Sequence, residues 1–341
     1  MERIPLSPPK ILPITDGLHR PLWSVMIPAY NCSQYLLETI QSVLQQDMGI
    51  ELMQIEVVDD CSTDSNVEEL VNKIGKGRVS YFRQKQNVGS LRNFETCINR
   101  SRGKYIHLLH GDDRVKKGYY SAIKEVFEKF PEAGAAFTSW DHIKSNGILS
   151  RQSTLEANEP CILDNWLYKL AELQRLQYAA ITVKREVYEK LGSFYLAHYG
   201  EDWEMWARIA KDYDTAYVPE FLAEYREHKN SITWQSYQTG QNIKDFEKVI
   251  TTIICYLPNE DQRKMLKVAK KNFVYWMLDE TLTNWFIIKN KKMVYNQIYN
   301  ILGLYIDRHV ISRVAVILLY VHSESYRKSL KKILRKTNIY A

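Results

Sequence analysis

The segment IEVVDDCSTD (Ile55–Asp64) decides the fold, because an apolar run there ends directly in two carboxylates. Three more segments place a small polar cluster after apolar residues: SVMIPAYN (Ser24–Asn31), YIHLLHGDD (Tyr105–Asp113) and GEDWEMW (Gly200–Trp206). Short apolar runs bounded by turn residues indicate buried strands. Ligands bind to an open α/β sheet beyond the carboxyl ends of its strands. The clusters that follow strands are therefore expected to share one crevice.

Around these segments, predicted strands alternate with predicted helices. The strands are expected at Val25–Ala29, Ile55–Val58, Val79–Arg83, Tyr105–Leu109 and Ala135–Trp140. The helices between them are expected at Ser33–Leu44, from Asp64 or Ser65 to Ile74, at Ser90–Arg100 and at Lys117–Phe130. Such alternation is typical of a mostly parallel sheet with right-handed crossovers. We therefore predict a Rossmann-like α/β fold in which the first four strands lie in the order 3-2-1-4.

The pattern becomes irregular after Asn146. A helix is expected at Trp203–Lys211, two short strands at Thr215–Val218 and Leu222–Arg226, and an almost wholly helical region from about Ile243. These changes predict three parts of the chain. They are an irregular lead-in at residues 1–22, an α/β domain at 23–235 and a helical, basic C-terminal region at 236–341.

The composition is that of a globular protein in a reducing compartment. Of the 341 residues, 45% are hydrophobic and 25% are charged, which argues against disorder. The five cysteines form no CxxC pair, which argues against a zinc ribbon and a disulfide framework. The first residues lack the apolar core of a secretory signal, and no run reaches the roughly 18 apolar residues of a membrane span. We therefore expect a cytoplasmic protein.

Two acidic pairs follow predicted strands. Asp59 and Asp60 either cap the next helix, whose N-terminus favours negative charge, or accept hydrogen bonds from a base or a ribose. Asp112 and Asp113 follow the strand at Tyr105–Leu109, where a simple turn also explains the sequence Gly-Asp-Asp. Carboxylates suit Mg²⁺ or Mn²⁺, which bridges two phosphates and stabilises a departing diphosphate. For both pairs we favour ligand binding.

Other polar side chains are expected beside the same crevice. Tyr30 and Asn31 end the first cluster, and Arg92 and Asn93 lie on the helix predicted at Ser90–Arg100. Arg92 and Asn93 are either surface residues or part of a nucleotide site. All four are candidates for binding a nucleotide sugar.

Two late clusters offer proton-transfer and anion-binding groups. Glu201 and Asp202 precede a helix, where acids are common, but one of them is also placed to act as a general base that deprotonates a hydroxyl. Arg226 and His228 end a later predicted strand. They either pair with phosphate, complete a metal shell or remain solvated.

Six motifs in this order closely resemble the family 2 glycosyltransferases of the GT-A fold: SVMIPAYN, VVDDCSTD, NVGSLRN, GKYIHLLHGDD, GEDWEMWARIA and YREHKNS. The resemblance runs from about Ser24 to Ser231. It implies a metal-dependent enzyme that takes a sugar from a nucleotide-diphosphate sugar, with a UDP-sugar expected, and inverts the anomeric carbon by direct displacement. A carbohydrate or lipid-linked acceptor in bacterial surface polysaccharide or glycolipid synthesis is the expected setting.

The resemblance also implies roles for single residues. Pro28, Tyr30 and Asp60 match positions that hold the base and the ribose. Asp202 matches the Asp of the ED pair, which is the catalytic base of the family.

The metal motif departs from the family pattern at one position. Asp112 and Asp113 correspond to its acidic end, but His110 stands where the family often has Asp. Imidazole also binds Mn²⁺, so His110 is a candidate ligand. His228 matches a histidine often found near the diphosphate or the metal. The QxxRW motif of processive polysaccharide synthases is absent, which favours one sugar added per encounter.

The C-terminal region is strongly basic, with 18 Lys and Arg against 8 Asp and Glu from Gln241 onward. The segment YRKSLKKILRK (Tyr326–Lys336) predicts an amphipathic helix. It either packs on the catalytic domain or docks on an anionic membrane surface, which would make the protein peripheral on the inner face of the membrane. No nucleic-acid reader motif accompanies the charge. The rival functions are a catalytically silent nucleotide-sugar-binding protein and a membrane adaptor.

Overall fold

Strand β1 (Trp23–Ala29) is central to the architecture. In a computed structural model, which describes residues 2–15 and 17–322, all seven residues of β1 are buried. Parallel strands flank it on both sides: β2 (Met53–Asp59) and β4 (Tyr105–Leu108). A parallel strand that is covered on both faces carries a continuous apolar run. This burial explains why these segments show no alternation of apolar and polar residues.

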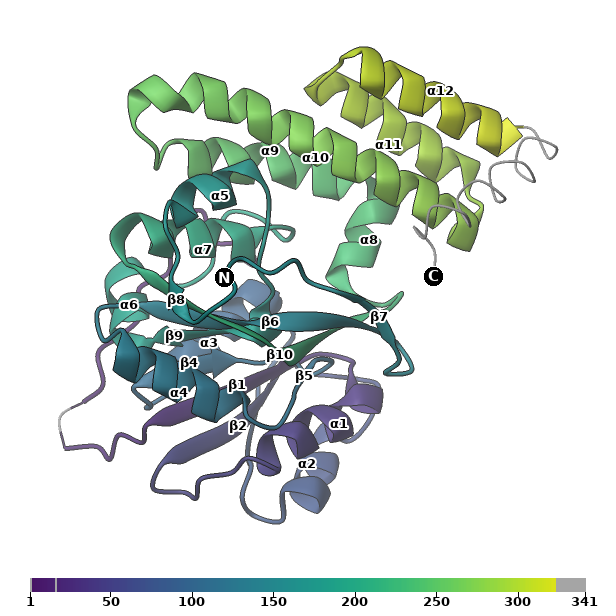
Figure 1. Ribbon diagram of the computed structural model, residues 1–341. Helices are drawn as coiled ribbons and strands as arrows, with labels where there is room; N and C mark the ends of the chain where they lie inside the picture. The colour runs from purple at the N-terminus through teal and green to yellow at the C-terminus, as the bar shows by residue number, and fades with distance from the viewer. Residues whose placement is uncertain (1, 16, 323–341) are drawn as a thin grey trace. The chain divides into compact units, whose positions relative to one another are not determined.

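The chain divides into two compact units, both of which are drawn in Figure 1. The first comprises the residues up to Leu170 and Gln174–Ser231, and the second comprises Ala171–Leu173 and the chain from Ile232 onward. The first unit is a mixed α/β structure with a mostly parallel central sheet, so the predicted fold class is confirmed. The predicted boundary at residue 235 stays a prediction.

The first unit contains every strand of the part of the chain that the structure describes. Besides β1, β2 and β4, these are β3 (Ser80–Arg83), β5 (Arg114–Val115), β6 (Ala135–Lys144), β7 (Leu149–Gln152), β8 (Cys161–Ile162), β9 (Ile181–Lys184) and β10 (Thr215–Glu227). Its helices are α1 (Ser33–Leu44), α2 (Val67–Gly75), α3 (Ser90–Arg100), α4 (Tyr119–Lys129), α6 (Arg185–Leu191) and α7 (Glu201–Asp212), with a 3₁₀ turn, η1 (Tyr178–Ala180). Helix α5 (Trp166–Glu172) lies where the two units divide.

The strands follow the order β3-β2-β1-β4-β9-β6-β10-β5. The first four match the predicted order. Strand β9 is antiparallel to both of its neighbours, β4 and β6. Strands β1, β2 and β4 are parallel, so their carboxyl ends lie at one edge of the sheet. The polar clusters that follow these strands are thereby brought to the same edge.

Helical spacing of apolar residues attaches α1 and α3 to this sheet. Leu36 and Ile40 on α1 are fully buried, as are Leu91 and Ile98 on α3. Helix α3 packs on β1, β2 and β4, and α1 packs on β1 and β5. Both helices thus bury an apolar face against strands of the edge that carries the polar clusters.

The structure differs from the sequence-based expectation in two local features. The two short strands expected near the end of the first unit form one strand, β10, whose pairing with β6 shifts register between Val218 and Ala223. Helix α2 is capped by Asn66, whose side chain accepts a hydrogen bond from the Glu69 N–H. Asp64, an expected cap, accepts instead from the Ser33 N–H at 2.9 Å. This hydrogen bond ties the loop after β2 to the start of α1.

The described part of the second unit is helical. Its helices are α8 (Ile232–Thr239), α9 (Gln241–Ile254), α10 (Asn259–Ile288), α11 (Lys291–Leu304) and α12 (Arg308–His322). Among residues 2–15 and 17–322, no helix is both long and apolar enough to cross a membrane. The amphipathic helix predicted at Tyr326–Lys336 lies outside the described residues.

A substitution at Gly103 tests how closely the chain approaches β1. A Cβ there would lie 2.4 Å from the Ser24 backbone nitrogen and 2.5 Å from the Trp23 carbonyl carbon, and backbone atoms have no room to yield. Gly103→Ala is expected to lower the free energy of unfolding by about 3 kcal/mol, as overpacking in a core does. Urea unfolding followed by circular dichroism measures the effect.

Gly303→Ala is the matched control. Gly303 is on α11, and a Cβ added there meets no heavy atom within 4 Å among the described residues outside its own helix turn. Because alanine favours helix, this variant should match the wild type or gain up to about 1 kcal/mol. Equal stability of the two variants would contradict the close approach at Gly103.

Candidate functional site

The turn His110–Asp113 connects β4 to β5 and lies against the carboxyl end of β1. The Gly111 N–H donates a hydrogen bond to the Pro28 carbonyl oxygen at 3.1 Å. A Cβ at Gly111 would lie 2.7 Å from the Cys32 sulfur, so only glycine lets the turn approach this closely. The turn is thereby placed at the end of the strand that Tyr30 follows, and Tyr30 is 51% exposed.

The Arg226 side chain, which is fully buried, holds this turn from β10. Its Nε donates to the Asp112 carbonyl oxygen at 2.7 Å, and its backbone N–H donates to Asp113 Oδ1 at 2.8 Å. Its Nη2 also pairs with Glu38 on α1 at 2.8 Å. Because its donors are used inside the protein, Arg226 positions the acidic turn, and we do not assign it to phosphate binding.

Three side chains of the turn form a candidate cation site. The ligand atoms of His110, Asp112 and Asp113 all lie within 4.8 Å of one another. His110 Nε2 and Asp113 Oδ2 are buried and have no hydrogen-bond partner among the described residues. Buried polar atoms are normally satisfied, so two orphans in one cluster call for a missing partner. A divalent cation that accepts one nitrogen and several oxygen ligands fits this set.

The ionisation of the cluster agrees with a cation site. Burial raises the pKa of Asp113 well above its usual range, and the neighbouring Asp112 carboxylate raises it further. Burial lowers the pKa of His110, which keeps the imidazole neutral and its lone pair available. Bringing two acids together in a buried turn is costly, and a positive charge offsets that cost.

His228 lies beside this cluster. Its Nε2 is 2.8 Å from Asp112 Oδ2, and only 8% of the side chain is exposed. Its ring packs against the Tyr35 ring, with centroids 5.0 Å apart. The structure thus brings His228 to the carboxylate of one candidate ligand, and its role as a ligand stays a prediction.

Asp202 is the second residue of α7, and its buried carboxyl group has defined partners. Its Oδ1 accepts from the Trp203 N–H and its Oδ2 from Gln174 Nε2, both at 2.7 Å. Burial raises the pKa of Asp202 to about 7, against the lowering effect of these hydrogen bonds. A carboxyl group with this pKa exchanges protons near neutral pH, as a general base requires.

Aromatic rings connect the start of α7 to the acidic turn. The Tyr178 hydroxyl donates to Glu201 Oε1 at 3.2 Å, and the Tyr178 ring lies 4.2 Å from the His110 ring. The Phe94 ring on α3 also stacks on the His110 ring, with centroids 5.1 Å apart. Trp206 belongs to the same cluster and is 2% exposed, which makes it a core residue. The cluster fixes the candidate base relative to the candidate cation site.

The two acids at the end of β2 accept hydrogen bonds from within the protein. Asp59 is fully buried and accepts from the Ser62 N–H, the Tyr81 hydroxyl and Arg83. Asp60 is 2% exposed, and its carboxylate accepts from the N–H groups of Val88 and Gly89 and from the Asn87 side chain. In this arrangement Asp60 shapes the loop before α3.

Of the remaining candidates, two form hydrogen bonds inside the protein and one lines a cavity. Asn93 is 2% exposed and donates to the Val58 carbonyl oxygen at 2.8 Å. Asn31 has a φ of 50° and accepts from the Thr63 N–H at 2.8 Å. Arg92 lines a cavity in front of α3.

Sequence reasoning missed Gln174, Tyr178 and Arg3. Gln174 and Tyr178 come from the irregular region after Asn146, where no strand-end pattern marks them. Arg3 belongs to the expected lead-in, yet it lines the same cavity as Arg92. Only the folded arrangement brings Gln174 to Asp202, Tyr178 to His110 and Arg3 to the cavity that Arg92 lines.

Comparisons with known proteins agree with this geometry. The family described as "Glycosyl transferase family 2" matches residues 24–192. A putative teichuronic acid biosynthesis glycosyltransferase of Bacillus subtilis, TuaG, is 26% identical over 263 residues, which are 72% of this chain and 98% of that protein. The chain belongs to glycosyl transferase family 2.

Two solved structures share the fold. S. aureus TarS 1–349 in complex with UDP-GlcNAc is 15% identical with a TM-score of 0.62, and the match covers 90% of this chain and 92% of that one. The mannosyltransferase PcManGT from Pyrobaculum calidifontis, in complex with GDP-Man and Mn²⁺, is 16% identical with a TM-score of 0.55 and coverages of 95% and 86%. At this level of identity the likeness establishes the GT-A fold alone.

Removing the Arg226 guanidinium tests whether it holds the turn. Arg226→Met removes the hydrogen bonds of a buried guanidinium to the Asp112 carbonyl oxygen and to Glu38, so we expect a loss of about 2–3 kcal/mol in the free energy of unfolding. Arg151→Met is the control, because the Arg151 side chain is 54% exposed and its ion pair with Glu227 should contribute less than about 1 kcal/mol. Equal losses in urea unfolding would show that Arg226 has no special role.

Proposed function

We propose that the protein is an inverting glycosyltransferase that moves a sugar from a nucleotide-diphosphate sugar to an acceptor hydroxyl. The observation that carries this proposal is the pair of orphaned buried ligand atoms, His110 Nε2 and Asp113 Oδ2, at the carboxyl end of the parallel strands. An unsatisfied acidic site there suits a cation with a diphosphate better than a neutral ligand.

The relatives support the same substrate class. One neighbour was solved with UDP-GlcNAc and another with GDP-Man and Mn²⁺. We take a UDP-sugar as the first donor to test. The relative named for teichuronic acid biosynthesis supports a carbohydrate or lipid-linked acceptor in surface polysaccharide or glycolipid synthesis.

His110, Asp112 and Asp113 would hold Mn²⁺ or Mg²⁺, and His228 would steady Asp112 or join the ligands. Bound there, the cation supplies positive charge against the diphosphate that departs. Arg226 keeps the two acids together in the absence of substrate, so little rearrangement is needed when the donor binds.

Asp202 accepts the proton of the acceptor hydroxyl. The hydrogen bonds from Gln174 and the Trp203 N–H hold the carboxylate in one orientation, and its oxygens keep further lone pairs that can accept a proton. The oxygen then attacks the anomeric carbon from the face opposite the leaving diphosphate, which inverts the configuration. On the nucleotide side, Tyr30 and Pro28 lie at the end of β1, where we place the base and the ribose.

The decisive experiment is a panel of nucleotide sugars with and without Mn²⁺, on the wild type and on Asp113→Asn. The Asn side chain keeps an oxygen for the Arg226 N–H but removes the charge. We expect one donor to be turned over, a Mn²⁺-dependent rise in Tm in the wild type only, and a loss of about 100-fold or more in transfer rate in the variant. If no donor is bound or turned over, the protein is not a transferase of this class. Binding without turnover would favour the catalytically silent alternative.

The pH dependence of transfer tests Asp202. The ionised carboxylate is the active form, so kcat/KM should rise about tenfold per pH unit below pH 7 and level off above the pKa of about 7. Gln174 lowers the pKa of Asp202 through its hydrogen bond, so Gln174→Met should move the rising limb to higher pH. A profile that is the same in both proteins would contradict the assignment of Asp202 as the base.

A further inference from the structure

The segment Glu2–Leu12 precedes the residues that match the family and crosses the first unit as an N-terminal strap. It contains no helix or strand. Hydrogen bonds fasten it along its length. They run from the Leu196 N–H to the Pro5 carbonyl oxygen (3.0 Å), from the Ser193 N–H to Pro9 (2.8 Å), from Arg185 Nη2 to Leu12 (2.9 Å) and from the Leu12 N–H to Asn99 Oδ1 (3.1 Å).

Packing shows that the strap belongs to the folded unit. Pro5 is buried, and Ile11 is 1% exposed. Gly192, with a φ of +80°, lies so close that a Cβ would be 2.7 Å from the Pro9 carbonyl oxygen. The strap therefore occupies a fixed path between α3 and the loop that leads from α6 to Asp202.

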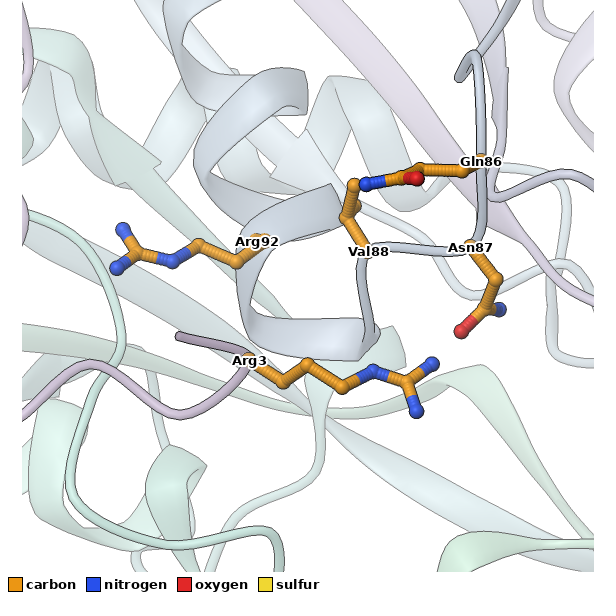
Figure 2. A pocket seen from close by; sticks show the side chains of 5 residues that line it. All are labelled: Arg3, Gln86, Asn87, Val88 and Arg92. Atoms are coloured by element: carbon orange, nitrogen blue, oxygen red, sulfur yellow. The ribbon is translucent and has the colours of Figure 1, made fainter. Parts of the chain in front are cut away.

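At its first residues the strap reaches a cavity of about 320 Å³ in front of α3. The lining residues are Arg3, Gln86, Asn87, Val88 and Arg92, and Figure 2 shows them. Arg92 Nε donates to the Glu2 carbonyl oxygen at 2.9 Å, which fixes the backbone beside Arg3. In Figure 2 the Arg3 guanidinium points toward the side of the cavity where Asn87 lies, while the Arg92 guanidinium points the other way.

The cavity adjoins the carboxyl end of β2. Asn87 Nδ2 donates to Asp60 Oδ2 at 3.0 Å, and the Val88 N–H donates to Asp60 Oδ1 at 2.7 Å. Burial raises the pKa of Asp60, and these backbone hydrogen bonds and the charge of Arg3 oppose that rise. The Asp60 N–H donates to the Ala29 carbonyl oxygen at 2.8 Å, so this end of β2 adjoins the end of β1 at which we place the nucleotide.

The Arg3 side chain has unused binding capacity. A guanidinium carries five N–H donors and no acceptor. Among residues 2–15 and 17–322, no side chain forms an ion pair or a hydrogen bond with it. A ligand rich in acceptor oxygens, such as a nucleotide, matches a donor fork that faces a cavity.

We propose that Arg3 binds the nucleotide of the donor, so that the N-terminal strap is part of the donor site. This inference rests on the proposed function and adds to it a residue from outside the matched family region. Arg3 supplies N–H donors to acceptor oxygens of the base, the ribose or the phosphates.

The test is calorimetric titration of the full chain with UDP and with GDP, each with Mn²⁺, on the wild type, Arg3→Ala and Arg3→Gln. Both variants lose a charge-assisted hydrogen bond, so the Kd of whichever nucleotide binds should rise by about tenfold or more. Lys10→Ala is the control, because Lys10 is an exposed basic residue of the same strap. It should bind as the wild type does, and all four proteins should keep the same Tm.

The outcomes separate this inference from the proposed function. If the wild type binds neither nucleotide, both ideas fail. If it binds one and the Arg3 variants bind equally well, or if Lys10→Ala weakens binding as much, the role of Arg3 is wrong while the proposed function stands.

If the Arg3 variants bind more weakly, titration with uridine or guanosine shows which part of the nucleotide Arg3 contacts. An equal loss of affinity for nucleoside and diphosphate places Arg3 at the nucleoside, and a loss for the diphosphate alone places it at the phosphates.

Discussion

The buried guanidinium of Arg226 is the contact on which the acidic site depends. It joins β10 to the turn after β4 and to Glu38 on α1, which is 188 residues away in sequence. Two carboxylates in a buried turn repel each other and lose hydration, so such a turn opens unless a positive charge holds it. The Arg226 guanidinium supplies that charge. Asp113 Oδ2 and His110 Nε2 still have no hydrogen-bond partner among the described residues.

The rest of the site follows from this division of labour. The Arg226 guanidinium is one positive charge beside the turn. The two buried atoms without a hydrogen-bond partner, His110 Nε2 and Asp113 Oδ2, favour the binding of a second positive charge, the metal ion. The Tyr178 ring contacts the His110 ring and its hydroxyl donates to Glu201, which fixes the turn relative to the first residues of α7, where Asp202 lies. A site arranged in this way is largely formed before substrate arrives, which reduces the rearrangement that catalysis must drive.

Much of this arrangement is predictable from local sequence, because it depends on strand ends. A continuous apolar run followed by Asp60 or by Asp112 and Asp113 marks the carboxyl end of a parallel strand, and sheet topology brings such ends together. The structure also assigns Asp60 and Asn93 to internal hydrogen bonds, which a local pattern does not distinguish from ligand contacts. Gln174, Arg3 and the buried state of Arg226 were beyond prediction because each depends on contacts between segments far apart in the chain.

The path of the N-terminal strap has a consequence for how the protein is made. Its first residues leave the ribosome early, but the strands and loops that fasten them end near residue 196, and the Arg185–Leu12 contact alone spans 173 residues. Contacts of such long range close late, because the loop entropy must be overcome first. The contacts of the strap with Arg185, Ser193 and Leu196 can therefore form only after most of the first unit has been synthesised.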